Sequence, residues 1–152
     1  MSLEDQIKQT SFASQTEKAF VNINFTHSYV SSRINSRFKS YNVSVQQYNV
    51  LRILKGQHPK PVSVNDITDR MIDKMSNASR LVEKLRTKEL IERKPCSFDK
   101  RQVDVCLTPK GIALLDTLNS QISELILEHS HLTQGEYETL NFLLDKLRKE
   151  ED

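Results

Sequence analysis

The chain has 152 residues, of which 37% are hydrophobic and 28% charged, with only three glycines and four prolines. This length suits one domain with an ordinary core, and the composition is typical of a helix-rich folded chain rather than a disordered or repetitive one. No apolar run reaches the roughly 18 residues of a membrane-spanning helix, and the first residues have no secretory pattern. We therefore expect a cytoplasmic protein with no membrane partner.

The formal net charge of +2 hides an uneven distribution along the chain. Residues 74–101 carry nine Lys or Arg and four Asp or Glu, whereas residues 102–152 carry four basic and ten acidic residues. A basic block of this kind is typical of a surface that faces a polyanion, but charge runs also occur on ordinary solvated helix faces. Charge alone leaves both interpretations open.

Apolar residues at a spacing of three and four predict a first long helix over about residues 11–41. Ser44 with Gln47 forms a capping-box pattern, which predicts the start of a second helix that ends near Gly56. The two prolines within residues 58–61 then predict a loop, because proline cannot continue a helix.

Two short helices in tandem are predicted next. Ser63 followed by Asp66 has the cap-plus-acid pattern of a helix start. Asp73 is expected to cap the second short helix, over about residues 74–88.

Alternating apolar and polar residues predict a β-hairpin made of residues 91–96 and 102–107. Thr108 and the proline after it predict the start of a long helix, and a capping box at Thr133 predicts a last one. The long helix carries an apolar stripe of nearly heptad rhythm, and a charge at Leu118 or Ile122 on that stripe is expected to dissociate a dimer.

This order of elements predicts a mainly α fold with a small β-hairpin wing, that is, a winged helix-turn-helix, whose second helix enters the DNA major groove. Residues 42–108 would form the DNA-binding core of a single domain spanning residues 1–152. The flanking helices, in residues 11–41 and 109–150, carry more apolar surface than this core can cover. We expect them to form a homodimer.

Three stretches carry a recognisable pattern. They are a helix-turn-helix in residues 67–71 and 78–85, a wing in residues 90–93 with the tip Asp99-Lys100-Arg101, and the junction Leu107-Thr108-Pro109-Lys110-Gly111. Their order and spacing resemble the MarR family of transcriptional regulators, including its L-T-x-x-G signature, over about residues 15–148. Two positions depart from the pattern: Thr68 replaces an alanine, and Glu89 stands where the family usually has glycine, so the recognition helix must end without the residue that favours αL.

The resemblance and the side-chain chemistry together give a set of expected DNA contacts. Arg80 can bind guanine bidentately, Asn77 suits adenine, and Arg101 at the hairpin tip can enter the minor groove. The expected DNA-binding residues are Ser63, Ser76, Asn77, Ser79, Arg80, Lys84, Lys100 and Arg101, with Lys88 and Lys94 as further phosphate contacts. Ser and Asn at these positions could instead be simple helix caps.

The leading interpretation is a homodimeric regulator that binds a near-palindromic operator in double-stranded DNA. The resemblance also implies a small aromatic effector that would release the DNA. Its cavity would be lined by Phe20, Asn24, His27, Tyr48 and Leu115. The alternative is a winged-helix module that binds proteins and not DNA, which the basic block argues against.

Nothing in the sequence points to catalysis. The four histidines lack the spacing of metal ligands, and no Gly-rich phosphate loop or nucleophile elbow is present. We expect no cofactor, no metal and no enzymatic activity. Cys96 and Cys106 are equally distant from Arg101 and could face each other in the hairpin, but a disulfide is not expected in the cytosol.

Overall fold

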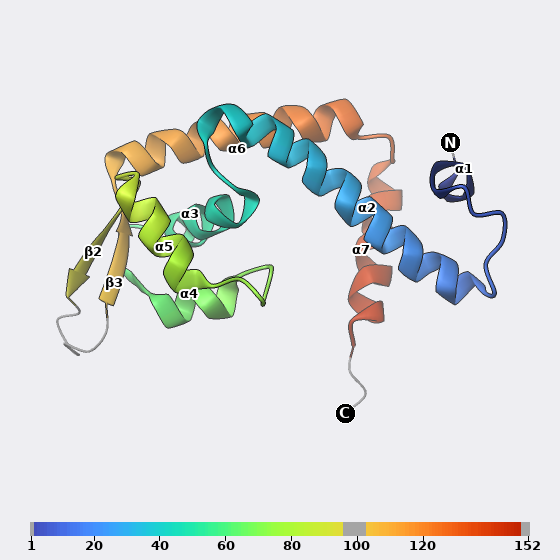
Figure 1. Ribbon diagram of the computed structural model, residues 1–152, viewed down its shortest axis with the longest axis horizontal. Helices are drawn as coiled ribbons and strands as arrows, with labels where there is room; N and C mark the ends of the chain where they lie inside the picture. The colour runs from blue at the N-terminus through green and yellow to red at the C-terminus, as the bar shows by residue number, and fades with distance from the viewer. Residues whose placement is uncertain (1, 96–102, 150–152) are drawn as a thin grey trace.

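The computed structural model describes residues 2–95 and 103–149 of the chain. Its helices are α1 (Leu3–Ile7), α2 (Gln15–Phe38), the 3-10 turn η1 (Lys39–Tyr41), α3 (Val45–Gln57), α4 (Val64–Arg70), α5 (Ala78–Thr87), α6 (Pro109–His129) and α7 (Gln134–Leu147). Its strands are β1 (Val62–Ser63), β2 (Ile91–Pro95) and β3 (Val103–Leu107). The strands, α4 and α5 gather at one end of the molecule, and the start of α2 and helix α7 lie at the other (Figure 1). The predicted mainly α fold with a β wing is confirmed.

Side-chain caps set most of the helix starts where the sequence predicts them. The hydroxyl groups of Ser44, Ser63, Thr108 and Thr133 each accept a hydrogen bond from the backbone N–H three residues further on. Helix α2 begins at Gln15 rather than near residue 11, because the Ser14 hydroxyl accepts from the Glu17 N–H and so acts as its cap.

The start of α5 differs from the prediction. Asn77, and not Asp73, caps this helix, since its side-chain oxygen accepts from the Arg80 N–H at 2.9 Å. Asp73 instead holds the preceding turn, where its carboxylate accepts from the Met75 N–H and the Ser76 hydroxyl, both at 3.0 Å. Aspartate stabilises turns and helix caps by the same kind of hydrogen bond, so its position in the sequence did not distinguish the two.

The sheet has one strand more than the sequence predicts, with β3 in the centre and antiparallel to both β1 and β2. Strand β1 has two residues, too few for an alternating pattern to reveal. In the register between β2 and β3, the residue opposite Cys106 is Glu92 and not Cys96, the arrangement that the sequence allowed without favouring a disulfide. Cys96 itself lies outside the described residues. Burial raises the pKa of the Cys106 thiol, which disfavours the reactive thiolate.

The core lies between α3, α5, α6 and the sheet, with the end of α2 packed on it. Its fully buried side chains include Phe38, Val50, Leu51, Ile67, Val82, Leu85, Val105 and Leu115. Leu118 is fully buried in this same core, so it is not exposed to a second copy of the protein, and a charge there would disturb the core before any interface. The apolar stripe of α6 packs within the protein itself, through Leu115, Leu118, Ile122 and Leu125, whereas Ile126 and Leu127 lie off that stripe and are exposed.

Helix α5 ends in a Schellman motif whose left-handed residue is Glu89, with φ of 61°. The Leu90 N–H donates to the Leu85 carbonyl at 3.1 Å, and the Glu89 N–H donates to the Arg86 carbonyl at 2.8 Å. Both Leu85 and Leu90 are buried, which adds the apolar contact that accompanies this motif. The chain thus takes the αL conformation at this position with a residue that disfavours it.

Glu89→Gly is expected to raise the free energy of unfolding by about 0.5–1 kcal/mol, because relief of the αL conformation outweighs the greater freedom of glycine in the unfolded chain. Urea denaturation of both proteins would measure this difference. Glu89→Gln is the matched control: it removes the exposed ion pair with Lys110 but keeps the αL conformation, and it should change stability little. A less stable Glu89→Gly variant would contradict the prediction.

Candidate nucleic-acid interface

Helix α5 has one face in the core and one face in solvent. Ala78, Val82 and Leu85 are buried, whereas Ser79, Arg80 and Lys84 are exposed. Arg80 and Lys84 are four residues apart and therefore lie one above the other on the same side of the helix. This helix is the second of the helix-turn-helix, and its exposed face carries two cations and a hydroxyl.

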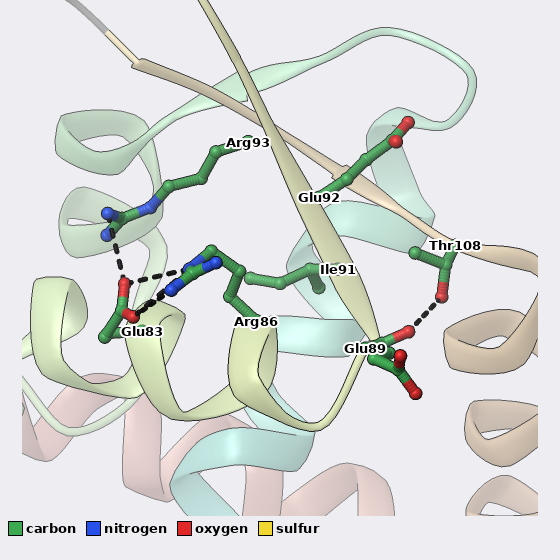
Figure 2. A pocket seen from close by; sticks show the side chains of 7 residues that line it. All are labelled: Glu83, Arg86, Glu89, Ile91, Glu92, Arg93 and Thr108. Carbon is green, nitrogen blue, oxygen red and sulfur yellow. Dashed lines mark hydrogen bonds and ion pairs between the residues drawn. The ribbon is translucent and has the colours of Figure 1, made fainter.

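The other cations near α5 have partners within the protein. Arg86 donates to Glu83 at 2.7 Å, and Arg93 of β2 reaches the same carboxylate at 3.2 Å (Figure 2). The hydrogen bond from Arg86 lowers the pKa of the Glu83 carboxyl, so the carboxylate stays ionised between the two guanidinium groups. These residues border a hollow of about 630 Å³ between α5 and β2, where the two guanidinium groups face three carboxylates, those of Glu83, Glu89 and Glu92.

Two lysines that the sequence suggests as phosphate contacts also have internal partners. The Lys88 ammonium donates to the Asn42 carbonyl and, at 3.2 Å, to the Gln47 side-chain oxygen, so it ties the end of α5 to the start of α3. Burial, with a smaller effect from Lys84, lowers the pKa of Lys88. Lys94 forms an exposed ion pair with Glu92 at 2.7 Å.

Arg80 and Lys84 differ from these cations. Among the residues that the structure describes, neither makes an ion pair, and both side chains are exposed. Ser79 lies beside them and forms no helix cap. The structure therefore brings together three of the predicted DNA-binding residues as groups that are free to contact a ligand.

The remaining predicted contacts are placed differently. The Asn77 oxygen caps α5, so the group that would accept from adenine is already in use. The Ser76 hydroxyl donates to Asp73, and the Ser63 hydroxyl donates to the Asp66 carboxylate at 2.7 Å, which puts a negative charge where a phosphate was expected. Lys100 and Arg101 lie outside the described residues.

The five residues expected to line an effector cavity do not surround one space. Leu115 is buried in the core, as is Tyr48, whose hydroxyl donates to the Asn119 side chain at 2.8 Å. Phe20 and Asn24 are exposed on the first half of α2. His27 borders a hollow of about 460 Å³ that lies between α2, α3 and the turn after α4.

Sequence reasoning missed two exposed apolar side chains in the turn between α4 and α5. Ile72 is 80% exposed and Met75 is 92% exposed. The prediction placed Met75 inside a helix, where an apolar residue needs no explanation. Asn77 is an equally good helix cap, and a helix start there would have placed Met75 in the preceding turn. An apolar residue in that turn would have stood out as a candidate contact.

No three His, Cys, Asp or Glu side chains among residues 2–95 and 103–149 are grouped to hold a metal ion. In the same residues, no helix combines the length and the apolar character that crossing a bilayer requires.

Comparison with known sequences identifies the family. A sequence model described as the MarR family matches residues 41–102. The HTH-type transcriptional regulator MgrA of Staphylococcus aureus is 32% identical over 113 residues, which cover 74% of this chain and 75% of MgrA.

Solved structures share the fold over nearly the whole chain. A MarR mutant from E. coli, crystallised with operator DNA, has a TM-score of 0.78 at 20% identity and covers 98% of this chain and 100% of that one. BpsR of Bordetella bronchiseptica, studied for the regulation of its DNA binding by 6-hydroxynicotinic acid, has a TM-score of 0.75 at 21% identity and covers 93% and 100%. The family match and the identity to MgrA show that the chain belongs to the MarR family of winged-helix transcriptional regulators.

Proposed function

We propose that the protein is a homodimer that binds a near-palindromic operator in double-stranded DNA, with α5 in the major groove and the hairpin over the adjacent minor groove. The observation that carries this proposal is the division of the cations around α5. Arg86, Arg93 and Lys88 are held by internal partners, whereas Arg80 and Lys84 extend freely from the exposed face.

The chemistry of that exposed face suits DNA. An arginine near the start of a recognition helix can bind the O6 and N7 atoms of guanine with two hydrogen bonds, and a neighbouring serine can donate to or accept from a base edge. A lysine one turn further, such as Lys84, suits a phosphate. The shared fold with E. coli MarR, which binds operator DNA in its crystal structure, supports this interpretation.

Helix α7 supports the homodimer. None of its residues is buried, although it carries the apolar residues Tyr137, Leu140, Phe142, Leu143, Leu144 and Leu147. An uncovered helix of 14 residues is marginal in water, so its apolar side chains need a partner surface. A second copy would supply that surface and would place two α5 helices about one DNA turn apart.

Substitutions on α5 should separate base reading from phosphate binding. Arg80→Ala is expected to cost about 1–3 kcal/mol per half-site on an operator selected from random DNA, and to relax the preference at one or two base pairs. Lys84→Ala should weaken selected and random DNA by similar factors, and should reduce the slope of log affinity against log salt by about one unit per contact. Titrations at several salt concentrations would measure both effects.

Arg86→Ala is the matched control, because Arg86 lies on the same helix but is held by Glu83. It should change the affinity for the operator less than Arg80→Ala does. If Arg80→Ala left operator affinity within twofold, α5 would not read bases, and the alternative of a protein-binding winged-helix module would be favoured.

Release by a small aromatic ligand is part of the same proposal. The hollow beside His27 is its candidate site, because Ile72 and Asp73 of the turn before α5 also border it. A ligand in this hollow would contact the segment that positions the recognition helix. Regulation of BpsR by an aromatic acid supports the idea.

A further inference from the structure

The turn between α4 and α5 exposes an apolar side chain where a DNA-binding helix begins. Met75 is 92% exposed and lies three residues before the first residue of α5. No described part of the chain covers it. Helix α7, which would face a second copy, lies away from this turn, toward the other end of the molecule (Figure 1).

This turn is held by hydrogen bonds from several sides. The Asp73 carboxylate accepts from the Met75 N–H and the Ser76 hydroxyl, and the Asp73 carbonyl accepts from the Ser76 N–H at 3.1 Å. On the other side, the Ile72 N–H donates to the Asn49 side chain of α3 at 2.9 Å. The backbone of Met75 is therefore fixed relative to α3 and α5, and its side chain is presented at a defined place.

The charged groups around Met75 favour a polyanion as the occupant. Arg70, Lys74 and Arg80 are exposed on the segments that flank it. Two acidic residues lie nearby: the Asp73 carboxylate is engaged in the turn, and Asp69 is exposed, with its backbone carbonyl accepting from the Lys74 ammonium at 2.5 Å. An apolar side chain flanked by an excess of basic over acidic residues fits a DNA groove better than it fits an apolar protein surface.

We propose that Met75 contacts the C5-methyl group of a thymine in each half-site of the operator, next to the base pair that Arg80 reads. This inference rests on the proposed function. In the major groove, thymine alone presents an apolar group, and it is read by apolar side chains. The flexible thioether of methionine can follow that methyl group closely, so Met75 adds thymine recognition to the hydrogen bonds of α5.

The test uses the full chain and an operator selected from random DNA, in which each thymine is replaced in turn by uracil in both half-sites. Uracil lacks only the methyl group, so base pairing is unchanged. The unsubstituted protein should lose about threefold to tenfold in affinity per half-site at one thymine. Met75→Ala should bind the thymine and uracil operators equally at that position, while keeping its sensitivity to the base pair read by Arg80.

Met75→Leu is the matched control, since leucine keeps an apolar side chain of similar volume at the same exposed position. It should keep the discrimination between thymine and uracil. Discrimination that persists in Met75→Ala, or its absence in the unsubstituted protein, would overturn the inference and leave operator binding intact. Failure to select any sequence would instead refute the proposed function, and binding to vesicles of anionic lipid that depends on Met75 would assign this side chain to a membrane surface.

Discussion

Gly111→Ala is expected to lower the free energy of unfolding by about 3 kcal/mol or more. A Cβ atom at Gly111 would lie 2.0 Å from the Leu90 carbonyl oxygen and 2.9 Å from the Leu90 carbonyl carbon. Both are backbone atoms in the link between α5 and β2, so no side-chain rotation can make room. The first turn of α6 would have to move away from this link.

That movement would break the contacts that join α6 to the end of α5. The Thr108 N–H donates to the Leu90 carbonyl at 3.2 Å, and the Thr108 hydroxyl donates to the Glu89 carbonyl at 2.8 Å. The left-handed Glu89 brings these carbonyls to the start of α6. Gly111→Ala should therefore lower the free energy of unfolding more than an added methyl group on a surface helix would.

Urea denaturation followed by circular dichroism would measure the loss. Gly56→Ala is the control, because nothing lies within 4 Å of a Cβ atom at Gly56 and its φ is not positive. That variant should be as stable as the unsubstituted protein or more stable by up to about 1 kcal/mol. A Gly111→Ala variant that lost less than about 1 kcal/mol would show that the start of α6 adapts easily.

Gly111 also illustrates what the sequence could not explain. Family resemblance marks this glycine through the L-T-x-x-G pattern but does not say why a glycine is needed. The structure gives the reason: any side chain here would clash with the backbone of Leu90, which is distant in the sequence. The helix caps were predictable because Ser44, Thr108 and Thr133 bond within three residues of themselves. Strand β1 was not, since it forms only by pairing with β3.

The candidate DNA-binding site was likewise predictable where it depends on local periodicity, and not where it depends on contacts between distant segments. The sequence placed Arg80 and Lys84 on the exposed face of the recognition helix, because apolar periodicity fixes which side is buried. It could not show that Arg93 shares Glu83 with Arg86, since that ion pair joins β2 to α5. It also could not tell which apolar residues of α6 belong to the protein's own core, because Leu118 and Ile126 both fit a spacing of i, i+4 and i+8, yet only Leu118 is buried.

Substitution of exposed apolar residues on α7 tests the proposed dimer directly. Phe142 is 65% exposed and Leu143 is 53% exposed, and neither belongs to the core cluster. The double substitution Phe142→Asp and Leu143→Asp is expected to convert the dimer to a monomer, because charges would enter an apolar interface without partners. Sedimentation velocity at micromolar concentration would measure the change.

Loss of the dimer should also weaken operator binding by about 100-fold or more, since one copy of α5 can then contact only one half-site. Glu138→Lys is the control, because it changes an exposed charge on the same helix and leaves the apolar residues in place. The thermal unfolding of the isolated double variant distinguishes a lost interface from a lost fold: α3, α5 and α6 keep their shared core, so cooperative unfolding should persist. A double variant that sedimented as a dimer would place the interface on other residues, with the exposed Ile126 and Leu127 of α6 as the next surface to substitute.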